Sequence, residues 1–95
     1  MAGNERDAAE SVQDVVAQAQ SLGEDERWDE AYRVLLDALG DAGDDPLLLT
    51  WAGLAAQRLG EEGEAYEHFR RALAGQPQDP FILAAAGSGV AMYTL

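Results

Sequence analysis

One sequence pattern occurs twice in this chain, at a fixed offset of 34 residues. A period of this length is typical of proteins built from stacked supersecondary units, in which each unit buries its apolar face against the next. The chain of 95 residues has room for about two and a half such units. The residues that recur are Glu30-Ala31-Tyr32 as Glu64-Ala65-Tyr66, Ala38-Leu39 as Ala72-Leu73, Asp45-Pro46 as Asp79-Pro80, and Gly53 as Gly87.

The signals for helix starts and stops follow the same period. Asp45-Pro46 and Asp79-Pro80 each place a capping carboxylate before a proline at the first helical position, where the missing N–H costs nothing. Gly60 and Gly75 are placed to end helices. Apolar residues recur at helical spacing between these signals, as in residues 47–59 and 61–74. The sequence predicts an all-α fold of tandem antiparallel helix pairs, an α-solenoid of five helices.

The predicted boundaries follow from these signals. A flexible N-terminal segment, residues 1–8, is expected to precede one domain over residues 9–95. Within it, repeat 1 covers about 12–45, repeat 2 about 46–79, and a terminal helix about 80–95.

The repeat resembles the tetratricopeptide repeat. That family's signature has a Trp, a Leu-Gly and a Tyr, then an Ala, an aromatic residue four positions later, a second Ala and a Pro. The resemblance covers roughly residues 12 to 95. Its departures are Trp51, two places after the expected aromatic, Gly43 in place of proline, and Glu62 in place of the aromatic matched by Trp28. The matching residues are Val15, Gln18-Ala19, Leu22, Ala31, Leu35 and Ala38 in the first unit; Leu49, Ala52-Gly53, Ala56, Ala65, Phe69, Ala72 and Pro77 in the second; and Leu83, Ala86-Gly87 and Val90 in the last.

The resemblance implies a concave groove lined by the first helix of each pair, and therefore a non-enzymatic adaptor or scaffold that binds a peptide or protein segment. Trp51 is either the aromatic anchor of this groove or a core residue packed on neighbouring helices, and the sequence leaves both open. Some family members bind chaperone tails through groove lysines and arginines; here only Arg58 falls on that face. The expected partner-binding residues are Leu47, Thr50, Trp51, Leu54, Gln57, Arg58, Phe81, Ala85, Ser88 and Met92, with Gln13, Ala17, Gln20, Glu24 and Ala84 beside them.

The charge of the chain restricts its partners. Eighteen acidic residues and six basic ones, all arginine, give a formal net charge of -12. Such a surface repels phosphate backbones and anionic lipid headgroups, so we expect neither nucleic acid nor a membrane as partner. The charge serves either solubility or the attraction of a basic partner. The absence of cysteine excludes disulfides and fits a cytoplasmic location.

No residue pattern points to catalysis, a metal or a cofactor. His68, the one histidine, is expected at the surface, off the inner stripe of its helix. Ser88 lies in Gly87-Ser88-Gly89, which is not a nucleophile elbow. The acidic pairs are explained by helix-start electrostatics. We therefore expect a protein that is not an enzyme.

The last predicted helix, residues 81–95, has no charged side chain. We expect Leu83, Ala86, Gly87 and Val90 to pack on the preceding pair. A terminal helix normally has a polar outer face, and this one does not. Three explanations are open: the chain is a fragment of a longer array, the helix pairs with its copy in a homodimer, or it covers a bound partner.

Overall fold

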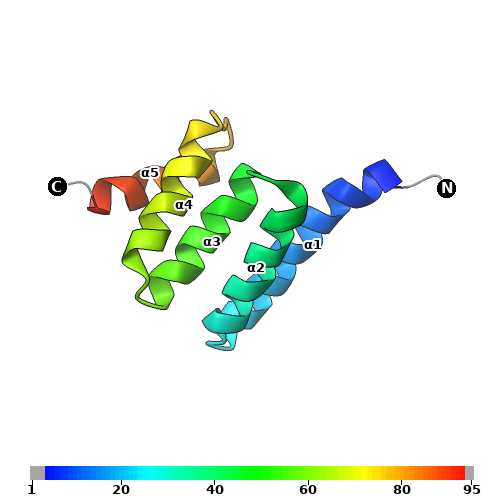
Figure 1. Cartoon of the computed structure of the whole chain (residues 1–95), viewed down its shortest axis with the longest axis horizontal. Helices are drawn as coiled ribbons and strands as arrows, with labels where there is room; N and C mark the ends of the chain where they lie inside the picture. Colours follow the sequence, from blue (N-terminus) through cyan, green and yellow to red (C-terminus); the bar gives the residue numbers. More distant parts are fainter. Residues whose placement is uncertain (1–3, 94–95) are drawn as a thin grey trace.

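The computed structural model describes the backbone of residues 4–93 and the side chains of residues 12–93. This part of the chain forms five helices and no strand (Figure 1), which confirms the predicted all-α class. Connections of a few residues make consecutive helices run in opposite directions (Figure 1). The helices are α1 (Asn4–Glu24), α2 (Trp28–Ala42), α3 (Pro46–Arg58), α4 (Glu62–Ala74) and α5 (Pro80–Tyr93).

The first helix begins earlier than expected. Residues 4–8, predicted to be part of a flexible segment, belong to α1, and residues 1–3 lie outside the described part. The stretch after Asn4 is rich in Glu, Arg and Ala and has no Gly or Pro, so helix propensity favours this extension.

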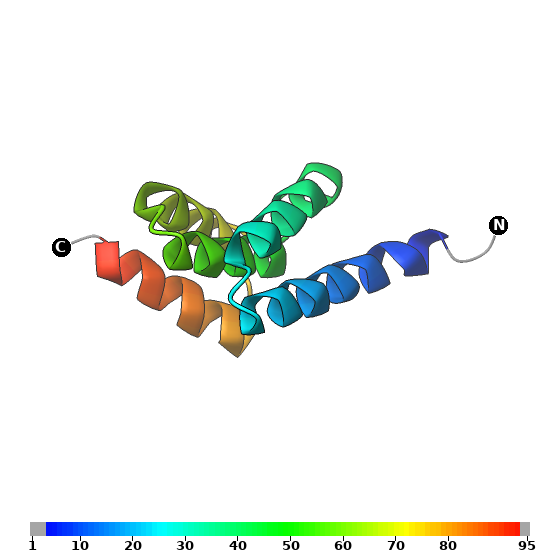
Figure 2. The same cartoon turned by 90° about the horizontal axis from the view of Figure 1, so that it is seen from below.

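The central element of the fold is α3. Each helix contacts the next along the chain, and α3 also contacts α1 and α5. Figure 2 shows α2 and α4 on one side of α3, with α1 and α5 on the other. Within the described residues, no helix has the length and hydrophobicity of a membrane span.

Local sequence chemistry fixes where α3 and α5 start. The Asp45 carboxylate accepts hydrogen bonds from the backbone N–H groups of Leu47 and Leu48, at 2.9 and 3.1 Å. The Asp79 carboxylate accepts one bond, 2.8 Å from the N–H of Phe81. These bonds satisfy N–H groups that have no partner inside the helix. Gly60 follows the end of α3 with φ +80, a conformation that costs a side-chain-bearing residue more than glycine.

Two clusters of buried side chains form the core, and α3 contributes to both. Leu48 faces the first cluster and Leu49 the second, and neither side chain is exposed to solvent. This double burial explains why α3 is apolar on more than one side. The first cluster comprises Val16, Ala19, Ala31, Leu35, Leu48, Ala52 and Ala55, and the second Leu49, Ala56, Ala65, Phe69, Ala72, Ile82 and Ala86.

Phe69 of α4 is the largest fully buried side chain among residues 12–93, and two glycines make room for it. A β-carbon built on Gly53 of α3 or on Gly89 of α5 would overlap its ring. The ring therefore lies against bare backbone of both helices, which lets α3, α4 and α5 approach closely.

The predicted inner face of the last helix was partly wrong. Leu83 is 47% exposed, whereas Ile82 is buried at 5%. Ala86 is buried as expected, and Gly87 and Val90 are half-buried. The buried set of α5 is thus Ile82, Ala86 and Gly89. Because Gly89 must face the ring of Phe69, the helix is rotated so that Leu83 turns outward.

Candidate functional site

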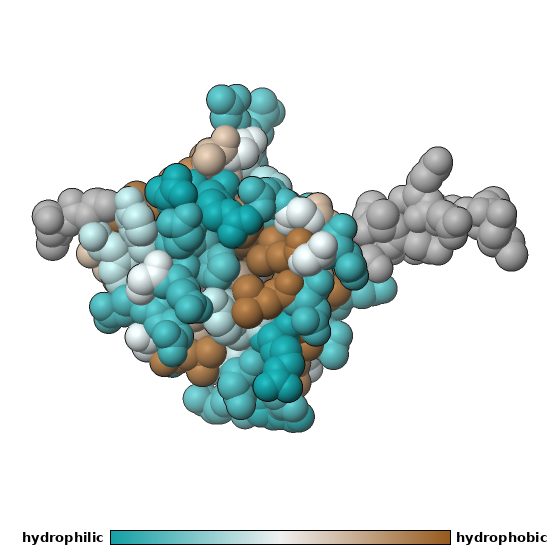
Figure 3. All heavy atoms as spheres, in the orientation of Figure 1, coloured by the Kyte–Doolittle hydropathy of each residue, from teal (hydrophilic) through white to brown (hydrophobic). Residues whose placement is uncertain are grey.

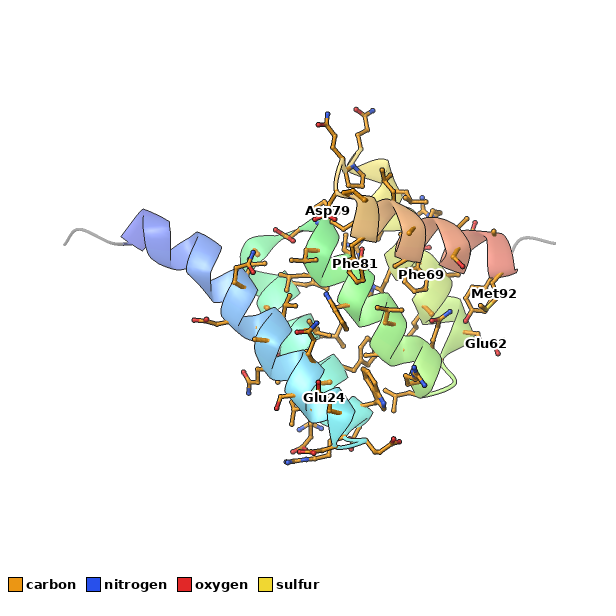
Figure 4. All side chains as sticks on the ribbon, turned by 180° about the vertical axis from the view of Figure 1, so that it is seen from behind. Glu24, Glu62, Phe69, Asp79, Phe81 and Met92 are labelled. Atoms are coloured by element: carbon orange, nitrogen blue, oxygen red, sulfur yellow. The ribbon has the colours of Figure 1, made fainter. Side chains whose placement is uncertain are left out.

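The side chains expected to bind a partner lie mostly on one face of the molecule, here called the α1/α3/α5 face. Seen from behind, α3 lies between α1 and α5 (Figure 4). Trp51 of α3 stacks on Phe81 of α5, with ring centroids 5.5 Å apart and an angle of 29° between the ring planes. The Gln57 amide lies 3.7 Å from the sulfur of Met92. Residues of α3 and α5 that are far apart in sequence thus form one surface.

The α3 part of this face is half-buried. Leu47, Trp51, Leu54 and Gln57 are all partly exposed, and Arg58 is exposed. Leu47 and Trp51 also pack against the first core cluster, so Trp51 is a core residue on one side and a surface residue on the other.

Thr50 does not belong to the α1/α3/α5 face, which corrects our assignment. Its side chain is fully buried, and its hydroxyl donates a 2.8 Å hydrogen bond to the Pro46 carbonyl oxygen. A hydroxyl satisfied by the preceding turn of its own helix can be buried at little cost, so polarity alone did not reveal its position.

The α5 part of the face is open to solvent. Phe81 is 42% exposed and Met92 58%. Ser88 is exposed and Ala85 is half-buried. These four residues follow helical spacing, and their two end members contact α3, so they form one stripe along the helix.

A pocket of about 300 Å³ lies where the end of α1 meets α3. Gln20, Gly23 and Glu24 near the C-terminal end of α1 line it, together with Trp28 of α2 and Trp51 of α3. The Arg58 guanidinium lies 5.5 Å from the centre of the Trp28 ring, in a cation–π contact. The sequence predicted Gln20, Glu24 and Trp51 on the groove face, but it predicted neither Trp28 there nor the pocket itself.

A second hollow, of about 380 Å³, lies between α1 and α2. Apolar side chains line it, with Leu48 among them, and Asp37 and Asp41 lie beside them. This cleft was not predicted, because the residues that line it come from three different helices. Figure 3 shows the side of the molecule formed by α2 and α4, where hydrophilic side chains predominate around an apolar patch over α2.

His68 is buried, in contrast to the surface position that we expected. It is 8% exposed, and its Nε2 lies 2.9 Å from the Tyr32 hydroxyl. That hydroxyl donates a 2.7 Å hydrogen bond to the Glu64 carboxylate. Because the Tyr32 hydroxyl proton is donated to Glu64, the Tyr32 oxygen accepts a hydrogen bond from the Nε2–H of His68. The buried Nδ1 of His68 has no hydrogen-bond partner.

The Tyr32–His68 contact joins α2 to α4 and has electrostatic consequences. Burial, assisted by Arg71, lowers the pKa of His68. Burial and the hydrogen bond to Glu64 raise the pKa of Tyr32. Both shifts favour the neutral side chains at physiological pH. The sequence did not predict this contact, because it depends on two helices that are not adjacent in the chain.

Comparisons with models of known protein families, with curated proteins and with solved structures returned no match. Across the residues that the structure describes, no group of three or more His, Cys, Asp or Glu side chains is placed to hold a metal ion. The chain is therefore assigned by its structure to the all-α class.

Proposed function

We propose that this chain is a tetratricopeptide-like interaction module that binds a peptide or protein segment across the α1/α3/α5 face and catalyses no reaction. The observation that carries the proposal is the stacked pair of Trp51 and Phe81 in the middle of that face. Large aromatic side chains that keep exposed surface are typical anchors for partner segments.

The chemistry of the partner follows from the charge. Eighteen acidic residues against six basic ones attract a basic partner and repel an acidic one. Several arginines already contact acidic side chains, as Arg71 does with Asp44 and Arg27 with Glu30. The expected ligand is a basic segment with apolar side chains, in a cytoplasmic setting that suits a chain without cysteine.

Exposed small residues allow a test that spares the core. Ala17 of α1 and Ser88 of α5 are exposed, and each shares a helix face with residues of the α1/α3/α5 face. Ala17→Arg and Ser88→Arg introduce bulk and an unfavourable charge without removing a buried contact. Ala74→Arg at the end of α4 is the matched control, since Ala74 is exposed outside this face.

The experiment is a selection from a random peptide library on the wild-type protein, followed by affinity measurements on the variants. Ala17→Arg and Ser88→Arg should each weaken binding of the selected peptides, while Ala74→Arg should not. Equal affinity for all three variants would place the binding surface elsewhere and refute the proposal.

Self-association is a second candidate function. Leu83, Phe81 and Met92 are each more than 40% exposed on a helix without a charged side chain. This helix would make a two-fold contact through residues 81–95, of which 94 and 95 lie outside the described residues. Light scattering after gel filtration tests it: a dimer that becomes a monomer in Leu83→Glu supports this candidate, and a monomer at every concentration refutes it.

A further inference from the structure

We propose that the pocket lined by Trp28, Trp51 and Glu24 is a binding site for the guanidinium of an arginine side chain. The proposal rests on the proposed function in one respect: the segment bound across the α1/α3/α5 face supplies this arginine. It goes beyond that function by naming one subsite and the chemical group that it takes.

The two indole rings of the pocket favour a cationic ligand. An indole ring attracts a cation placed over its face, and among the aromatic side chains it does so most strongly. The only two tryptophans of the chain both line this pocket. The Arg58 guanidinium already lies over the ring of Trp28, so the arginine of a ligand stacks on the ring of Trp51, with Trp28 forming the wall of the pocket.

The positions of the two rings are fixed by packing. Trp28 lies against Gly23, where an added β-carbon would overlap the ring. Trp51 stacks on Phe81 of α5 and also lines the pocket. Rings that are held before binding lose little side-chain entropy when a ligand arrives.

Two sources of negative potential complete the site. Glu24, the last residue of α1, contributes an exposed carboxylate, and Figure 4 shows it at the end of that helix. The C-terminus of a helix carries partial negative charge, and the last turn of α1 has no basic residue to offset it. An arginine matches this set of groups better than a lysine, because its planar guanidinium can stack on an indole and bond a carboxylate at once.

The test uses a capped tripeptide with arginine between two alanines as the probe. The protein is titrated at constant ionic strength, and binding is followed by the NMR signals of the two indole N–H groups and by tryptophan fluorescence. A tripeptide with citrulline in place of arginine keeps the shape and removes the charge. We expect saturable shifts of both indole signals with arginine, and binding at least about ten-fold weaker with citrulline.

The variant Glu24→Gln should weaken arginine binding by about three-fold or more. Asp41→Asn is the matched control, because it removes the same charge from an exposed side chain in the cleft between α1 and α2. Equal binding of the arginine and citrulline peptides, or equal losses in the two variants, would overturn the proposal, since both outcomes mean that no specific cation site exists.

The outcome is separable from that of the proposed function. The tripeptide titration reports on the pocket alone, whereas Ala17→Arg and Ser88→Arg report on longer segments along the face. If arginine binds saturably but the library peptides bind those variants as well as the wild-type protein, the pocket is retained as a site and the α1/α3/α5 face is rejected. If the library peptides bind those variants weakly but the arginine tripeptide does not bind, the α1/α3/α5 face is retained and the pocket is rejected.

Discussion

The packing of Phe69 against Gly89 allows a sharp test of how the last helix is docked. Gly89→Ala and Gly87→Ala place the same methyl group two residues apart on α5. A β-carbon at Gly89 overlaps the Phe69 ring, whereas one at Gly87 has no atom within 4 Å. Gly87→Ala should therefore stabilise the protein by about 0.5–1 kcal/mol, the usual gain from glycine to alanine inside a helix.

Gly89→Ala has the same helix gain, but it also forces a buried ring to move. Inserting a methyl group into a packed core costs about 1–3 kcal/mol. Since the helix gain is common to both variants, the difference between their free energies of unfolding isolates the cost of the overlap, and it should be about 1–3 kcal/mol. Urea denaturation followed by far-UV circular dichroism measures both values.

A double variant checks the cause. Phe69→Leu removes the flat ring that fills the space beside Gly89, so in that background the difference between the two alanine variants should shrink. If Gly89→Ala is as stable as Gly87→Ala in the wild-type background, the docking of α5 on Phe69 described above is wrong.

Three further predictions concern single side chains. Asp45→Ala should lower the free energy of unfolding by about 1 kcal/mol, and Asp79→Ala by less, because Asp45 caps two N–H groups and Asp79 one; urea denaturation compares them. Because burial lowers the pKa of His68 below its unfolded value of about 6.5, the unfolded chain binds the proton more readily, and the free energy of unfolding should fall as the pH drops below about 6.5. This pH dependence should be flatter in His68→Phe than in the wild-type protein. The same pH dependence in both proteins would contradict the burial of His68. Trp51→Ala should cost about 2 kcal/mol, roughly half the loss for a fully buried Trp, and a thermal melt that matches wild type would show that Trp51 lies wholly at the surface.

The two kinds of test complement each other for Trp51. Removal of its side chain affects both core packing and any ligand contact. A loss of binding in Trp51→Ala alone therefore does not show that the ligand contacts the α1/α3/α5 face. The substitutions at Ala17 and Ser88 change the same face without a core contact. For this reason they, and not Trp51→Ala, carry the test of the proposed function.

Much of the helical framework could be predicted from local signals. The Asp-Pro pairs and the glycines predicted helices over 47–59 and 61–74, and the structure has Pro46–Arg58 and Glu62–Ala74. These boundaries depend on capping and on backbone conformations that a few neighbouring residues decide. Most of the expected binding residues could also be placed on one face, because helical periodicity relates residues of the same helix.

What the sequence alone determined about this protein is therefore its five helices and most of their ends, the start of α1 being the exception. Which side of each helix is buried was decided by tertiary packing wherever the helix carries no clear apolar stripe. Ile82 and Leu83 are both apolar, so composition alone does not decide which of them is buried. The packing of the Phe69 ring against Gly89 sets the rotation of α5, which buries Ile82 and exposes Leu83. His68 is buried because Tyr32 reaches it from another helix. The pocket between the two tryptophans likewise exists only where three helices meet, because no single helix carries the residues that line it.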